Sequence, residues 1–115
     1  MRRRLLTVAV AGSPLGAVAR RDTLDVELHE WSLGGVVLVS IPGEGFAELG
    51  ARILAGRAGT PTLLCGFAPH WLGYLPVPFG DGYEEGLSYG ETAVDAIARA
   101  LEVPNSRSDG ISCAK

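Results

Sequence analysis

The sequence has few of the residues from which metal sites and disulfide frameworks are built. Its 115 residues include two histidines and two cysteines. Two cysteines cannot form a disulfide framework, and neither has the CxxC or Cys/His spacing of a metal clip. Cys65 lies in an apolar run and is expected to be a small core residue, whereas Cys113 lies in a polar tail. With so few histidines, the chain alone is not expected to complete a metal site.

Excess charge of one sign and long hydrophobic runs are also missing. The formal net charge is -3 with the signs interspersed. No broad basic face is available for a phosphate backbone, so nucleic acid is not expected as a partner. No apolar run is long enough to cross a membrane. Hydrophobic residues at 47% and charged residues at 20% are typical of a folded globular chain, and the length fits one domain.

The first residues have two interpretations. Basic residues 2–4, the apolar stretch 5–11 and the small residues 17–19 imitate a signal peptide with its cleavage motif. The apolar stretch is short, and Arg20 and Arg21 would follow the cut, where positive charge hinders export. We expect residues 1–22 to form an apolar arm, either a strand or an irregular segment, and the chain to be cytoplasmic rather than secreted. Secretion stays open as the alternative.

Hydrophobic periodicity predicts a small α/β fold. Residues 23–31 alternate apolar and polar side chains, so they indicate a half-buried strand with His29 on its polar side. Gly34 and Gly35 predict a turn, and the apolar run 36–39 is typical of a strand covered on both faces, which completes a β-hairpin. From Phe46 the apolar spacing becomes helical, and residues 62–67 indicate another buried strand. Strand, helix and strand then form a βαβ unit with parallel strands and a right-handed crossover.

The second half of the chain predicts a long loop and a closing helix. Residues 68–90 are rich in glycine, proline and aromatics, and loops of this length are usually functional. Ser88 and Glu91 have capping-box spacing ahead of a helix that runs to Leu101. The expected fold is a small mixed sheet, built from a β-hairpin plus a βαβ unit and closed by a C-terminal helix. Residues 23–102 form its body and 103–115 a polar tail. Because such a core is thin, we expect the chain to dimerise or to dock on another half.

Two residues lie at the edge of the sheet where folds of this topology bind ligands. Ligands in open α/β sheets bind at the carboxyl ends of parallel strands. Glu44 follows the strand 36–39 in what we expect to be the first turn of a helix, and Tyr74 lies in the loop after the strand 62–67, so the two are expected to approach each other. Spacing alone favours structural roles, in which Glu44 stabilises the helix N-terminus and Tyr74 packs in a small aromatic core.

A family resemblance favours a different role for this pair. It is carried by Ile41-Pro42-Gly43-Glu44 before a helix, by Gly66-Phe67-Ala68 with Gly73-Tyr74-Leu75-Pro76, and by Tyr83-Glu84-Glu85-Gly86. In order and spacing, these blocks resemble the C-terminal part of the catalytic domain of the neutral (alkaline, non-lysosomal) ceramidase family, especially its bacterial relatives. The similarity extends from about residue 24 to residue 101.

The resemblance implies a zinc amidohydrolase that cleaves the N-acyl bond of ceramide, with zinc held by two histidines, a glutamate and a tyrosine. Glu44 matches the glutamate ligand and Tyr74 the tyrosine ligand. Zinc would lower the pKa of a bound water for attack on the amide carbonyl. A tyrosine at the metal would also help to stabilise the developing oxyanion, so Tyr74 is the candidate catalytic residue.

The sequence departs from the family at the histidine ligands, which the family takes from an N-terminal half that this chain does not contain. His29 and His70 occupy neither position, and each is expected to be solvent-facing or hydrogen-bonded. His70 remains a candidate substitute ligand because it lies four residues from Tyr74. The site then needs an N-terminal half or a second copy of the chain, its substrate when complete is a lipid amide, and this chain alone is expected to be inactive.

Two other functions stay open. In the first, the same scaffold is a non-catalytic binding or assembly module, and Glu44 merely caps its helix. In the second, a small secreted protein contacts lipid through apolar residues of the long loop. Those residues are Trp71, Leu72, Leu75, Val77 and Phe79. Packing of these side chains on the protein itself is the favoured interpretation.

Overall fold

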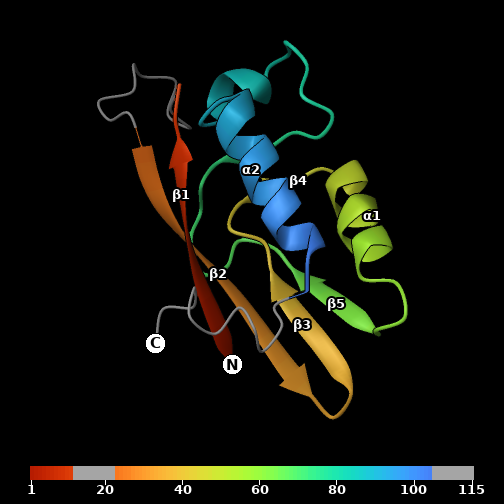
Figure 1. The fold of residues 1–115 in the computed structure, drawn as a ribbon. Coiled ribbons are helices and arrows are strands. Elements are labelled where there is room, and N and C mark those ends of the chain that lie inside the picture. Colours follow the sequence, from red (N-terminus) through yellow and green to blue (C-terminus); the bar gives the residue numbers. More distant parts are fainter. Residues whose placement is uncertain (12–22, 105–115) are drawn as a thin grey trace.

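The computed structural model describes residues 1–11 and 23–104 and places a mixed four-stranded sheet behind two helices (Figure 1). The strand order is β1-β2-β3-β5. The strands are β1 (Arg2–Ala9), β2 (Thr23–Leu33), β3 (Val36–Ser40) and β5 (Thr62–Cys65). The β1–β2 and β2–β3 pairs are antiparallel, and the β3–β5 pair is parallel. The predicted fold class, a hairpin plus a βαβ unit, is therefore confirmed.

The hairpin turn forms where the sequence predicts it. Gly34 and Gly35 have φ angles of 58° and 88°. Two consecutive residues with positive φ suit a tight hairpin turn whose twist matches the strands, and glycine adopts this conformation without steric cost. Residues 2–9 of the N-terminal arm form a strand, one of the two predicted possibilities, and this strand pairs with β2 at the edge of the sheet. Residues 12–22, which include the small residues and the arginines of the signal-like pattern, lie outside the described residues.

Both helices pack on the same face of the sheet (Figure 1). Helix α1 (Ala47–Gly56) forms the crossover between β3 and β5 and buries Leu49 and Ile53. Helix α2 (Glu91–Glu102) closes the fold. Its buried side chains follow the predicted helical spacing and are Ala93, Val94, Ile97, Ala98 and Leu101. Their apolar stripe meets the inward-facing residues of the sheet, chiefly Val26, Leu28 and Val39.

Both helix starts differ from the sequence-based expectation. Phe46 is the N-cap of α1 and Glu48 is the acidic residue of its first turn, so the expectation that Glu44 lies in that turn is wrong. The N-cap of α2 is Gly90, with a φ angle of 102°. The predicted capping box is wrong because the Ser88 hydroxyl bonds within the preceding turn. It donates to the Glu85 carbonyl at 3.0 Å and accepts from the Gly90 amide at 3.1 Å.

The other face of the sheet is not covered by a helix of the described chain. Leu63 of β5 is 61% exposed and Leu5 of β1 is 51% exposed. Cys65 is also exposed. The expectations that Cys65 is a core residue and that residues 62–67 form a buried strand are therefore wrong. The physical reason is that both helices lie on one side, which leaves alternate residues of each strand open on the other.

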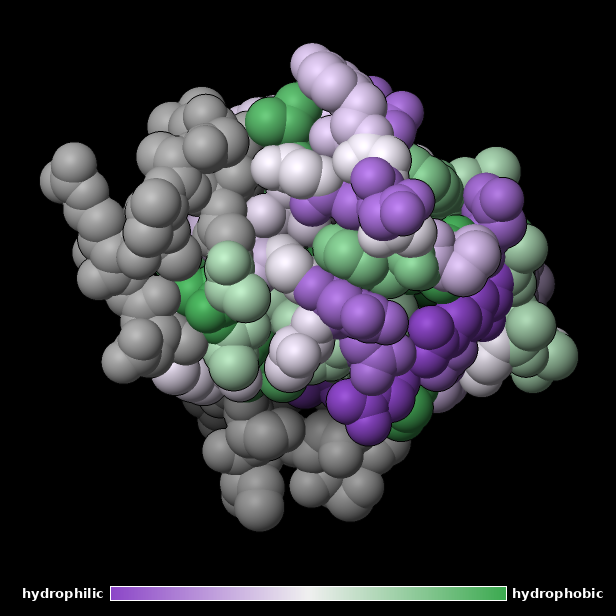
Figure 2. Space-filling model, turned by 90° about the horizontal axis from the view of Figure 1, so that it is seen from above, coloured by the Kyte–Doolittle hydropathy of each residue, from purple (hydrophilic) through white to green (hydrophobic). Residues whose placement is uncertain are grey.

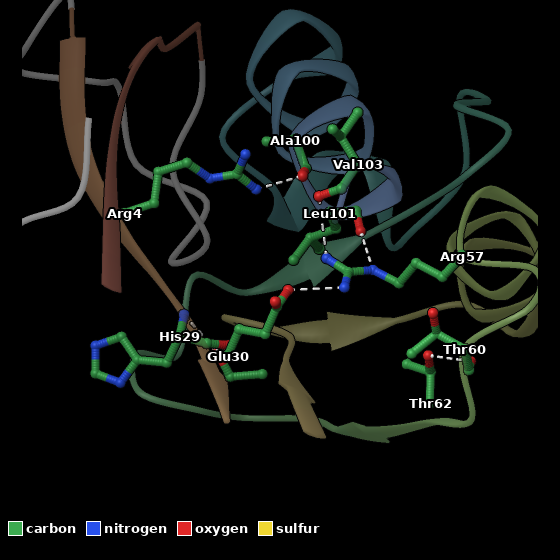
Figure 3. A network of polar contacts seen from close by, with 10 residues as sticks. Arg4, His29, Glu30, Arg57, Thr60, Thr62, Ala100, Leu101 and Val103 are labelled. Carbon is green, nitrogen blue, oxygen red and sulfur yellow. Dashed lines mark hydrogen bonds and ion pairs between the residues drawn. The ribbon is translucent and has the colours of Figure 1, made fainter. Parts of the chain in front are cut away.

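A buried ionic network closes the C-terminal end of α2 (Figure 3). Arg57 donates to the Glu30 carboxylate at 2.7 Å, to the Leu101 carbonyl at 2.8 Å and to the Val103 carbonyl at 3.2 Å. Arg4 approaches from the opposite side and donates to the Ala100 carbonyl. The two guanidinium groups satisfy carbonyls that a helix end leaves without intrahelical partners, and their charge complements the helix dipole.

Candidate functional site

The loops that follow β3 and β5 are joined by backbone hydrogen bonds. The Ile41 amide donates to the Cys65 carbonyl at 2.7 Å, and the Ala68 amide donates to the Ile41 carbonyl at 3.0 Å. The Leu72 amide then donates to the Pro42 carbonyl at 2.9 Å. These bonds continue the contact between the two parallel strands beyond the edge of the sheet. They place both loops at the carboxyl ends of β3 and β5, where ligands are expected.

Glu44 and Tyr74 face each other across a separate two-stranded parallel ladder. Strand β4 (Glu44–Gly45) pairs with β6 (Tyr74–Leu75), with Glu44 opposite Tyr74. The Glu44 amide donates to the Gly73 carbonyl at 2.8 Å. Both side chains are half-buried. The predicted approach of the two residues is confirmed, although the sequence pattern did not predict the ladder that produces it.

The close approach of the two segments depends on Gly43. A Cβ atom at this position would lie 2.6 Å from the Gly73 carbonyl oxygen, a distance that real Cβ atoms do not reach. Gly73 itself has a φ angle of 77°, a conformation that glycine tolerates best. Glycine at both positions therefore lets β4 and β6 pair.

The charge of Glu44 acts on Tyr74. The Glu44 carboxylate is the largest of the influences that raise the pKa of the Tyr74 phenol above its ordinary value of 10.0. Partial desolvation, Tyr83 and Glu84 raise this pKa further. Tyr74 is therefore protonated at neutral pH and available as a hydrogen-bond donor. Among the described residues, no cation forms an ion pair with Glu44.

Tyr83 is a member of the site to which the sequence assigned no role. Its ring contacts that of Tyr74 edge to face, with ring centroids 6.3 Å apart and planes at 67°. Tyr83 lies within a short loop, residues 80–85, that the Glu85 carboxylate closes on the amides of Gly80 and Gly82. The Tyr83-Glu84-Glu85-Gly86 block was visible in the sequence, but nothing in its spacing indicated that it folds back onto Tyr74.

The two histidines lie near a different carboxylate, that of Glu27. The Nε2 atom of His29 lies 3.5 Å from Glu27 Oε1, and the Nε2 atom of His70 lies 3.8 Å from Glu27 Oε2. Arg3 also approaches Glu27 Oε1, at 3.4 Å. His29 leaves β2 on the face opposite to Glu30 (Figure 3). The structure thus places both histidines near the acid of β2, and no hydrogen bond or ion pair joins His70 to Glu44 or Tyr74 within the described ranges.

A complete metal site is not present in the part of the chain that the structure describes. Across residues 1–11 and 23–104, no three histidine, cysteine, aspartate or glutamate side chains converge to hold an ion. Glu44 and Tyr74 are two of the four ligands that the family resemblance implies. The donor types suit zinc, and their number does not complete its usual coordination.

The apolar residues of the long loop mostly pack on the protein itself. Leu72 and Leu75 are buried, and Val77 and Phe79 pack against the core. Trp71 alone of the five is exposed, at 49%. Figure 2 shows the end of the molecule near α2 and this loop, where hydrophilic residues are interspersed with small hydrophobic patches. The favoured interpretation of this loop is confirmed. No helix among the described residues has the length and apolar character needed to cross a bilayer.

Comparison with family models, curated proteins and solved structures finds no match to this chain. The resemblance to ceramidases therefore rests on the three sequence blocks.

Proposed function

We propose that this chain is the C-terminal segment of a ceramidase-like zinc amidohydrolase. It contributes Glu44 and Tyr74 as ligands to a zinc site whose histidines lie elsewhere, on a separately encoded partner or on a longer parent chain. The observation that carries the proposal is the register of β4 and β6, which sets the glutamate and the tyrosine of two separate sequence blocks directly opposite each other. The two residues are thirty positions apart in sequence. Among residues 1–11 and 23–104, no cation forms an ion pair with Glu44.

Each residue has a distinct role in this proposal. The Glu44 carboxylate supplies negative charge toward a cation, and Tyr74 supplies a phenol oxygen that also donates a hydrogen bond to negative charge that develops on the substrate. Zinc, when bound, polarises an amide carbonyl and acidifies a water. The backbone bonds between the two loops hold both ligands rigidly, so little ordering remains to be done when the cation binds.

The partner in this proposal is a histidine-bearing N-terminal half, or failing that a second copy of this chain. The shortage of ligands requires it, and the uncovered face of the sheet supplies a surface for it. That face carries exposed apolar side chains, among them Leu5 and Leu63. With the partner in place the substrate is a lipid amide. Alone, the chain neither binds zinc tightly nor hydrolyses ceramide.

Zinc analysis of the purified chain tests the half-site directly. We expect substoichiometric zinc from this chain alone. Zinc titration followed by NMR of labelled tyrosines should shift the signals of Tyr74 before those of Tyr89, and Glu44→Ala should abolish the shift. Glu48→Ala, an exposed acid in the first turn of α1, is the matched control and should behave as the wild type. Stoichiometric zinc, lost in both Glu44→Ala and Tyr74→Phe, would show that this chain completes the site itself.

Reconstitution tests the activity. The neighbouring open reading frame should encode a histidine-bearing half, and co-expression of the two should give stoichiometric zinc and hydrolysis of an N-acyl sphingoid substrate. Tyr74→Phe should remove hydrolysis from that complex. A complex that forms, is well folded and holds no zinc would refute the amidohydrolase proposal.

The second candidate is a non-catalytic binding or assembly module. It is favoured by the absence of a third ligand among the described residues. The role that this candidate gave to Glu44, as the cap of a helix, is wrong, because Phe46 is the N-cap of α1. In this candidate, Glu44→Gln leaves partner binding and the response to zinc unchanged. The zinc titration above therefore separates the two functions.

A further inference from the structure

Glu85 closes a short loop by binding two backbone amides at once. Its Oε2 atom accepts from the Gly80 amide at 2.8 Å, and its Oε1 atom accepts from the Gly82 amide at 3.0 Å. Hydrogen bonds to an ionised acceptor are stronger than those between neutral groups. A Cβ atom at Gly80 would lie 3.0 Å from Oε2, and one at Gly82 would lie 3.1 Å from Oε1. A side chain at either glycine position would therefore crowd the Glu85 carboxylate.

Tyr83 lies within this loop, and its side chain is largely exposed. The residue is 72% exposed, yet its ring meets the Tyr74 ring edge to face. An exposed side chain loses conformational entropy when it is held in one orientation. A single aromatic contact offsets only part of that cost. The backbone that carries Tyr83 must therefore be fixed by other interactions. The Glu85 bonds on either side of Asp81 contribute to this, together with the bond from the Gly86 amide to the Gly82 carbonyl at 3.3 Å.

We propose that Glu85 is a positioning residue, which fixes Tyr83 beside Tyr74 by holding the amides of Gly80 and Gly82. The loop then gives the site a second phenol group, on a residue that is largely exposed to solvent. This deepens the proposed function and rests on it for the identity of the site. Two phenols beside the Glu44 carboxylate suit a substrate that presents a carbonyl together with hydroxyl groups, as an N-acyl amino alcohol does.

Nuclear Overhauser contacts between labelled tyrosine rings test the positioning role. The chain has three tyrosines, so the spectrum of tyrosine-labelled protein is simple, and half-buried Tyr89 reports on the fold. We expect a Tyr74–Tyr83 cross-peak in the wild type and its loss in Glu85→Gln, with the Tyr89 signals unchanged. Asp81→Asn removes the same charge from the same loop at an exposed residue and should retain the cross-peak. The full chain is used without zinc or substrate.

A second variant keeps Glu85 and disturbs the loop instead. Gly80→Ala places a methyl group against Oε2, and we expect it to weaken the Tyr74–Tyr83 cross-peak while Tyr89 stays unchanged. This variant decides the outcome if Glu85→Gln does not fold. The positioning role is overturned if the wild type lacks the cross-peak, if Glu85→Gln retains it, or if Asp81→Asn loses it equally. Because none of these readouts involves zinc, failure here is distinct from failure of the zinc titration.

Discussion

Two clusters of ionisable residues in this chain are built in opposite ways. The Arg57–Glu30 pair is buried, with side chains 3% and 10% exposed, and the guanidinium bonds to helix carbonyls as well as to the carboxylate. The Glu44–Tyr74 pair is half-buried at a loop edge and consists of two groups that become negative when they ionise. The first cluster has its countercharge inside the fold. The second holds a negative charge to which the described residues bring no cation.

This difference separates a structural cluster from a ligand site. A buried charge persists only when its partners are in place, and Arg57 has its partner in the Glu30 carboxylate. An acid placed beside a phenol raises the cost of ionising the phenol, and a cation bound between them would relieve that cost. The two clusters should therefore respond differently to mutation: one in the stability of the fold and the other in the titration of a side chain.

Removal of Arg57 should have the largest effect on stability. Arg57→Ala takes a cation from a buried pair with Glu30 and two hydrogen bonds from the C-terminal end of α2. We expect a loss of about 3 to 5 kcal/mol in the free energy of unfolding, measured by urea denaturation. Arg99→Ala is the matched control, because its ion pair with Asp95 is exposed and should be worth at most about 1 kcal/mol. Equal effects of the two variants would contradict the structural role of the network.

Gly43→Ala should affect both stability and the site. The new methyl group would lie 2.6 Å from the Gly73 carbonyl oxygen, so β4 and β6 must move apart. We expect a loss of about 1 to 3 kcal/mol from overpacking, together with a fall in the pKa of Tyr74 as Glu44 recedes.

The matched control for this variant is Gly86→Ala. A Cβ atom at Gly86 meets nothing within 4 Å. Its free energy of unfolding should stay within about 0.5 kcal/mol of the wild type, and the Tyr74 titration should not change. If Gly43→Ala unfolds no more readily than Gly86→Ala, the close pairing of β4 and β6 is wrong.

Much of this architecture was predictable from local patterns. Alternation gave the hairpin strands, Gly34-Gly35 gave the turn, and the spacing of Leu49 and Ile53 gave the buried face of α1. These features depend on residues close in sequence. The proximity of Glu44 and Tyr74 also followed, because parallel neighbouring strands deliver their loops to one edge.

Other features depended on contacts that no local pattern contains. Cys65 and Leu63 are apolar enough for a core, but whether a second layer covers them is decided by where the helices pack. The spacing predicted that Ser88 caps α2, but in the structure its hydroxyl bonds to the backbone of the turn that precedes the helix. Tyr83 reaches Tyr74 through the Glu85 loop, whose two bonds to glycine amides leave no periodic signature in the sequence.

Glu44→Gln should alter the site while leaving the fold intact. Loss of the carboxylate charge removes the main cause of the raised pKa of Tyr74, so this pKa should fall toward 10.0. NMR titration of labelled tyrosine measures it, with Tyr89 as the internal reference. We expect the free energy of unfolding to change by less than about 0.5 kcal/mol, in contrast to Arg57→Ala. Glu48→Gln, which removes an exposed charge from α1, should leave the Tyr74 titration where it is. An unchanged Tyr74 pKa in Glu44→Gln would refute the contact.

The smallest expected effect is the acid dependence contributed by Glu85. Its hydrogen bonds, led by that from the Gly80 amide, hold the pKa of this carboxyl below its ordinary value of 4.5. The folded state thus favours the ionised form. The contribution of Glu85 to stability is complete above about its unfolded-state pKa and is lost as the pH falls through the lower folded-state pKa. Urea unfolding at a series of pH values should show the wild type more stable than Glu85→Gln near neutrality, with the difference disappearing in acid. Asp81→Asn should not reproduce this convergence. Parallel stability curves for the wild type and Glu85→Gln would mean that the loop is not held by the Glu85 charge, and Tyr83 would then need another anchor at the edge where Glu44 and Tyr74 meet.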